Sequence, residues 1–152
     1  MDNIKPKLIV WLFPFAYLLH LLDEFLLGAG FAEWFSALFG VSLSENDFLV
    51  INITAFVLVA IIPVLYGMGK INNFIPAVLG ALFFFNGIVH LMITILTLMY
   101  SPGTITGLVV YIPLGIIVYI KIFPLLKEEQ RSLSIATAIG IHILISVAAF
   151  II

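Results

Sequence analysis

The sequence predicts an all-α, polytopic membrane protein built as a bundle of about five transmembrane helices. The 152-residue chain is 64% hydrophobic and 9% charged, whereas about a quarter of the residues in a soluble domain are charged. Its mean hydropathy is +1.30. Apolar stretches of the ~20 residues needed to cross a bilayer recur along the whole chain. We therefore expect one integral membrane domain over residues 1–152.

The first predicted helix follows two lysines, an arrangement also typical of a signal peptide. A cleaved apolar core usually has ~7–15 residues, but this stretch is longer and contains ionisable side chains. We therefore expect it to be retained. Ser44 and Asp47 form a capping-box pattern before the second helix, and Ser101-Pro102-Gly103 marks a turn between the third and the fourth. The predicted spans are residues 7–27, 47–66, 73–99, 104–124 and 131–152.

A shorter helix is predicted between the first two spans, over residues 31–39. Large apolar residues recur there at i, i+3, i+4, i+7 and i+8: Phe31, Trp34, Phe35, Leu38 and Phe39. This pattern is typical of an amphipathic helix that lies at the membrane interface. Such a helix acts either as an anchor or as a lid over a path for lipid-like molecules.

The basic residues predict the orientation of the bundle. All six fall at the start of the first span, between the second and third, or around the junction of the fourth and fifth: Lys5, Lys7, Lys70, Lys121, Lys127 and Arg131. The positive-inside rule then predicts a plasma (inner) membrane protein with a cytoplasmic N-terminus and an outside C-terminus. The net charge of −2 gives no reason to expect a nucleic-acid partner, and the lack of cysteine excludes thiolate ligands and disulfides.

Ionisable residues inside the spans are few and grouped. His20, Asp23 and Glu24 share one face of the first helix, because they are spaced i, i+3 and i+4. Asn86 and His90 are one turn apart on the third helix. Burying such a group uncompensated costs about 2.5–3.5 kcal/mol, so these residues are functional candidates.

The three histidines also agree in depth. The first, third and fifth helices run in the same direction. His20 lies eight residues before Gly28, His90 ten before Tyr100 and His142 ten before the end of the chain. At ~1.5 Å per residue these depths match within about one turn. We therefore expect the three side chains to converge inside the bundle.

A divalent metal would compensate the buried charge of such a cluster. Imidazole is the commonest metal ligand, and three protein ligands leave an open position on catalytic zinc. We predict His20, Glu24, His90 and His142 as metal ligands, with zinc as the first candidate and iron as the second. Asp23, Glu24 and Asn86 are the predicted catalytic residues. Which of the two carboxylates is a ligand and which a general base or a partner of a histidine N–H is left open.

These residues resemble the signature of the HXXEE family of small membrane proteins. The resemblance lies in His20-Leu21-Leu22-Asp23-Glu24, in Asn86-Gly87-Ile88-Val89-His90, in Tyr100-Ser101-Pro102-Gly103 and in the late His142. Asp23 departs from the pattern, because the signature has glutamate there. The resemblance implies that the histidines, carboxylates and Asn86 belong to one site and favours an enzymatic role, without naming a reaction.

Three functions fit these observations. The first is a membrane-embedded hydrolase, in which a metal-activated water attacks an ester, amide or phosphoester of a lipid-like substrate. The second is a small cation or proton-coupled transporter that uses the same cluster. The third is a structural subunit whose polar residues only join helices. The expected partners are the bilayer and a lipid-like small molecule, and a homo-oligomer is compatible with the sequence.

Overall fold

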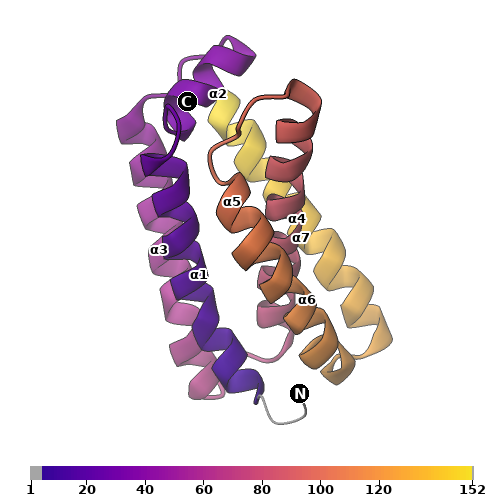
Figure 1. The fold of residues 1–152 in the computed structure, drawn as a ribbon. Coiled ribbons are helices and arrows are strands. Elements are labelled where there is room, and N and C mark those ends of the chain that lie inside the picture. The colour runs from indigo at the N-terminus through magenta and orange to yellow at the C-terminus, as the bar shows by residue number, and fades with distance from the viewer. Residues whose placement is uncertain (1–4, 152) are drawn as a thin grey trace.

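The computed structural model describes residues 5–151, which form helices and no strand (Figure 1). The long helices pack side by side as a bundle, and a short helix crosses one end. In chain order, the elements are α1 (Pro6–Leu26), α2 (Phe31–Phe39), α3 (Glu45–Gly67), α4 (Phe74–Thr97), α5 (Thr104–Thr106), the π-helical turn η1 (Gly107–Tyr111), α6 (Ile112–Lys121), the 3₁₀ turn η2 (Phe123–Leu125) and α7 (Glu128–Ile151).

Five helical segments are long and apolar enough to cross a membrane, which confirms the predicted class of membrane protein. Elements α5 to η2 together form the fourth, Thr104–Leu125. The five predicted spans differ from these segments by at most three residues at either end. The last predicted residue, Ile152, lies outside the described residues. Large side chains such as Phe15 and Leu58 are more than 60% exposed on the outer surface, as expected for helices surrounded by lipid.

Helix α1 has one buried face, and it is the face that carries the candidate site. Ile9, Val10, Phe13 and Ala16 are buried at helical spacing, and His20, Asp23 and Glu24 continue the same stripe toward the C-terminal end. The apolar part packs into a core shared with α4 and α6. The packing that fixes the rotation of α1 therefore also directs its polar residues into the bundle.

Helix α2 has the bounds that the aromatic pattern predicted. It begins after Gly30 and ends before Gly40. Both glycines have positive φ (76° and 67°), a backbone conformation that residues with a side chain rarely adopt. Trp34 and Phe35 are buried in a cluster with Phe48 of α3. The helix therefore covers one end of the bundle.

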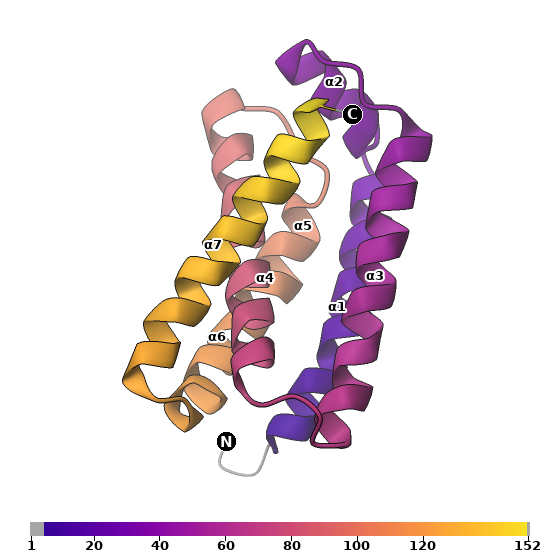
Figure 2. The same ribbon diagram turned by 180° about the vertical axis from the view of Figure 1, so that it is seen from behind.

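The predicted cap of α3 is also confirmed. The Asp47 backbone N–H donates to the Ser44 side-chain oxygen at 3.1 Å, which satisfies a free N–H group at the start of the helix. Helix α3 then packs along α1, and α7 packs along α4. Helices α3 and α7 flank the face of the bundle seen in Figure 2.

Two glycine contacts bring α4 very close to the fourth span. A Cβ atom on Gly80 would lie 2.4 Å from the Val118 side chain, and one on Gly87 would lie 2.7 Å from the Gly107 carbonyl oxygen. Gly107 opens η1, where the Ile112 N–H reaches back five residues to the Gly107 oxygen. Pro113, two residues after the end of this π-turn, lacks an N–H and cannot continue a regular α-helical ladder.

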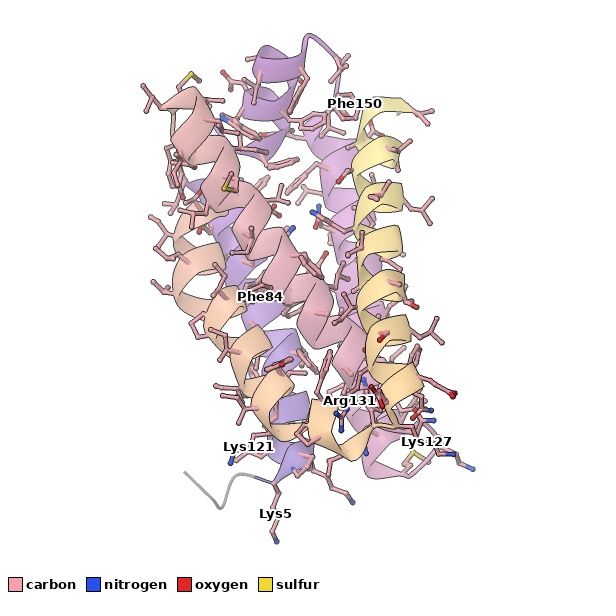
Figure 3. The ribbon with its side chains drawn as sticks, turned by 90° about the vertical axis from the view of Figure 1, so that its right-hand side faces the viewer. Lys5, Phe84, Lys121, Lys127, Arg131 and Phe150 are labelled. Carbon is pink, nitrogen blue, oxygen red and sulfur yellow. The ribbon has the colours of Figure 1, made fainter. Side chains whose placement is uncertain are left out.

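The two ends of the bundle differ in charge. Lys5, Lys121, Lys127 and Arg131 gather at one end, and Phe150 lies at the other, near α2 (Figure 3). Arg131 is held there by donating to the Phe123 carbonyl at 3.0 Å. The basic residues and the α2 cover therefore mark opposite ends.

Candidate functional site

Three of the predicted ligands meet between α1 and α4. The Glu24 Oε1 atom lies 3.4 Å from His20 Nε2 and 3.3 Å from His90 Nε2. The ligand atoms of the three residues all lie within 4.8 Å of one another, and each residue is buried. His20 and His90 also meet edge to face, with ring centroids 5.1 Å apart. The convergence predicted from helix depth is therefore observed for these two histidines.

The spacing suits a shared cation better than direct hydrogen bonds. Two atoms held ~2.0–2.1 Å from a tetrahedral zinc ion lie about 3.3–3.4 Å apart, which matches both distances to Glu24. His20 Nε2 is buried and has no hydrogen-bond partner among the described residues, despite its closeness to Glu24. The site thus holds an unpaired ring nitrogen that faces a carboxylate.

The other nitrogen of His20 explains why Nε2 is unpaired. His20 Nδ1 lies 2.8 Å from the Thr106 hydroxyl oxygen. That hydroxyl donates its one proton to Asp23 Oδ2 at 2.7 Å, so it accepts from His20, and Nδ1 carries the ring proton. The lone pair of a neutral ring is then on Nε2 and points toward Glu24. A metal ion or a second proton between them would remove this repulsion.

Asp23 contacts a loop, whereas Glu24, the next residue, faces the two histidines. Its carboxylate accepts hydrogen bonds from the Thr106 backbone N–H at 2.8 Å, the Gly103 N–H at 3.3 Å and the Tyr100 hydroxyl. Burial, together with this contact to Asp23, raises the pKa of Tyr100, so that the phenol remains a donor. Asp23 therefore fixes the loop between α4 and α5, and Glu24 faces the two histidines.

This loop closes tightly over the cluster at Gly103. The residue has φ of +96°, and a Cβ atom there would lie 2.9 Å from His20 Cε1, 2.9 Å from His90 Cε1 and 3.0 Å from Glu24 Cγ. Only glycine fits this combination of left-handed backbone and close approach. The motif predicted as a simple turn is thus one wall of the site.

The same loop orients His90. Its Nδ1 atom lies 3.1 Å from the hydroxyl of Ser101, which is fully buried. Ser101 is in turn positioned by its backbone N–H, which donates to the Thr94 hydroxyl at 3.0 Å. Each histidine therefore has one nitrogen held by a hydroxyl group and the other directed at Glu24, an arrangement typical of metal-binding histidines.

Aromatic rings complete the surroundings of the histidines. Tyr111 stacks on His20 with centroids 4.1 Å apart and an interplanar angle of 24°. Phe31 of α2 meets His90 edge to face at 6.0 Å. These rings restrict the rotation of both imidazoles.

The cluster forms part of the wall of a cavity of about 420 Å³. Most of the lining is apolar, and it comes from α1, α2, α3, α4, η1 and α7. Asn86 and His142 both contribute to the wall. His142 is half-buried and lies outside the group of three ligand atoms. The cluster thus adjoins a space large enough for a small-molecule ligand.

The structure assigns distinct places to the residues selected from the sequence. His20, Glu24 and His90 converge, Asn86 and His142 line the adjoining cavity, and Asp23 holds the loop. Sequence reasoning missed Ser101, Thr106 and Tyr111. Ser101 lies in the recognised turn, but Thr106, in the short helix α5, and Tyr111, the last residue of the π-turn, carry no motif.

The chain belongs to a family described as "Protein of unknown function with HXXEE motif", whose model matches residues 11–118. This range contains His20, Asp23, Glu24 and His90, together with the loop that orients the two histidines. His142 lies beyond it. No curated protein and no solved structure matches the chain.

Proposed function

We propose that this protein is a membrane-embedded, metal-dependent hydrolase that acts on a lipid-like substrate. The observation that carries the proposal is the buried His20–Glu24–His90 cluster in the wall of a largely apolar cavity. Two histidines and a glutamate form the ligand set of several zinc hydrolases, which keep a further position open for chemistry. We take zinc as the first candidate and iron as the second.

The metal would polarise a substrate carbonyl and lower the pKa of water toward ~7. The residues of the chain divide the remaining tasks. His20, His90 and Glu24 hold the cation. Asp23, acting through Thr106, keeps His20 in the tautomer that directs Nε2 at the metal. Asn86, one turn from His90, binds the substrate.

His142 has a different role in this proposal from the one the sequence suggested. It lines the cavity from α7 and lies outside the ligand group. An imidazole in that position can pass a proton to the leaving group, because a neutral ring has one nitrogen that donates and one that accepts. We expect His142→Ala to retain bound metal and to lose about 10²–10⁴-fold in turnover, the range typical of a general acid.

The orientation also forms part of the proposal. The basic end of the bundle faces the cytoplasm, as the positive-inside rule requires. Helix α2 and the site then lie toward the outer face of the membrane. A C-terminal reporter that is active only in the cytoplasm would contradict this orientation if it gave a signal.

The alternative is a cation or proton-coupled transporter. A continuous series of contacts favours it, because Asp23, Thr106, His20 and Glu24 are linked in that order. Such a series can relay protons. Uptake into proteoliposomes separates the two functions, since a hydrolase releases product without moving a solute.

The experiment that tests the hydrolase is turnover in lipid nanodiscs. Uncharged acyl amides and esters are supplied to the metal-loaded wild type, to the chelated wild type and to His142→Ala. Metal-dependent release of fatty acid that is strongly reduced in His142→Ala supports the proposal. Release that is equal in all three samples, or none in any of them, contradicts it.

A further inference from the structure

Outside the metal cluster, the residues that line the cavity include two polar atoms without a hydrogen-bond partner in the described part of the chain. Trp34 Nε1 and Asn86 Oδ1 are buried and have no hydrogen-bond partner among the described residues. Both residues line the cavity, and Trp34 is only 6% exposed. Leaving a donor and an acceptor unpaired in an apolar surrounding is costly. Each atom has almost no accessible surface in this conformation, so a ligand in the cavity would reach it through a small rearrangement of the side chain.

A second asparagine in the same wall shows the contrast. Asn52 accepts from the Tyr17 hydroxyl at 2.9 Å and donates to the Phe48 carbonyl at 3.0 Å. Both its amide oxygen and its amide nitrogen are bonded within the protein, whereas Asn86 Oδ1 has no partner among the described residues. The free groups at Trp34 and Asn86 thus mark specific positions in the cavity rather than a general property of its wall.

The charges of the wall restrict the ligand further. No lysine or arginine is present among the lining residues of the described chain, and Glu24 is the only carboxylate. Phosphate and carboxylate groups are normally bound by basic side chains. Apart from the proposed cation, an anionic head group would find no positively charged partner among these residues, so the wall beyond the metal cluster favours an uncharged ligand.

The wall of the cavity also includes residues at the exposed flank of the bundle. Its wall includes Ile51 of α3 and Ile145 of α7, and Ile145 is 47% exposed. Helix α3 packs on α1 and α7 packs on α4, and α3 and α7 flank the face of the bundle seen in Figure 2. The exposed flank lies in the membrane-spanning region. A molecule dissolved in the bilayer would therefore approach the cavity from this flank.

We propose that the cavity binds an uncharged amphiphile carrying an amide, which accepts a hydrogen bond from Trp34 Nε1 and donates one to the Asn86 carbonyl. An amide supplies both an acceptor and an N–H donor, whereas an ester supplies only acceptors. The inference names the substrate class of the hydrolase and in that respect rests on the proposed function. Binding itself requires no turnover.

The test is competition against radiolabelled N-methyldodecanamide in nanodiscs, because detergent would compete for an apolar cavity. The competitors are unlabelled amide, methyl dodecanoate and dodecyl phosphate. We expect the amide to bind about tenfold more tightly than the ester, a ratio at the upper end for one hydrogen bond. In metal-free protein, in which no cation can bind the phosphate, dodecyl phosphate should bind more weakly than either. Equal affinity of amide and ester, or preference for the phosphate in metal-free protein, would overturn the proposal.

Two variants assign the preference to its residues. Asn86→Leu should lower the amide affinity to that of the ester and leave the ester unchanged. Asn52→Leu is the matched control and should keep the tenfold preference. Trp34→Phe, which removes the N–H and keeps a ring, should weaken amide and ester alike. A preference that survives in Asn86→Leu would contradict the assignment even if the control behaved as expected.

A third variant separates this inference from the hydrolase. Glu24→Gln removes a metal ligand and should bind the amide with its preference intact, while showing no turnover. Preference without hydrolysis in the wild type would mean that the proposed function fails and the inference stands. Hydrolysis without a preference for the amide would mean that the proposed function stands and the inference fails.

Discussion

The two ends of the bundle are built on opposite principles. Toward the basic end, α4 packs against the fourth span so closely that Gly80 touches Val118. The neighbouring core residues Ile9, Val118 and Ile122 are fully buried. Toward α2, polar side chains and a cavity of about 420 Å³ take the place of such packing. The difference indicates that the close-packed end stabilises the fold. The polar groups and the cavity toward α2 do not add to stability and therefore indicate a binding site.

Asp23 and Glu24 show the same division within two consecutive residues. Asp23 is bound by the loop at Tyr100, Gly103 and Thr106. Glu24 is directed at His20 and His90, at 3.4 Å and 3.3 Å from their Nε2 atoms. One carboxylate therefore joins parts of the fold, and the other is available to a cation.

The largest effect is expected from adding a methyl group where two backbones touch. Gly87→Ala would place a Cβ atom 2.7 Å from the Gly107 carbonyl oxygen. Because a backbone atom cannot rotate away, we expect a loss of about 3 kcal/mol in the free energy of unfolding, at the upper end for overpacking. Reversible unfolding in mixed micelles measures it.

Gly140→Ala is the control for this substitution. Gly140 lies in α7, and a Cβ atom there would meet nothing within 4 Å. The substitution should be neutral or slightly stabilising, because alanine favours a helix more than glycine does. Equal stability of the two variants would refute the claim that the glycine contact holds α4 in place.

An intermediate effect is expected from removing the Thr106 hydroxyl, which joins Asp23 to His20 by hydrogen bonds. Thr106→Val removes the acceptor for His20 Nδ1 and the donor to Asp23. We expect zinc affinity to fall about 10–100-fold, as is typical when a group that orients a metal-binding histidine is lost. Competition with a chelator measures this. Thr54→Val, which removes a hydroxyl bonded only to its own helix, should leave the affinity unchanged.

The smallest effect is expected at the cap of α3. Ser44→Ala removes the acceptor for the Asp47 N–H and should cost about 1 kcal/mol of stability. Metal content should not change, because Ser44 lies outside the cluster. A loss of metal in this variant would mean that the site depends on the general stability of the α2 end, contrary to the comparison above.

Much of this architecture could be predicted from the sequence, because the length of an apolar stretch and the spacing of its residues can be seen directly in a short segment. The spans and the bounds of α2 follow from apolar spacing, and the pairing of His20 with His90 follows from their depth. Depth does not determine rotation about a helix axis, so it could not show that His142 lies outside the ligand group. The contacts of Ser101 and Thr106 depend on the loop and the π-turn, whose geometry has no simple sequence pattern.

Whether the His20–Glu24–His90 cluster binds a metal ion can be measured as metal content per chain in purified, lipid-reconstituted protein. Wild type is compared with Glu24→Gln and with Glu33→Gln, the same substitution at an exposed glutamate of α2. We predict about one zinc or iron per chain in the wild type and in Glu33→Gln, and almost none in Glu24→Gln. Metal that stays bound in folded Glu24→Gln, or no metal in the wild type after incubation with zinc, would contradict the account.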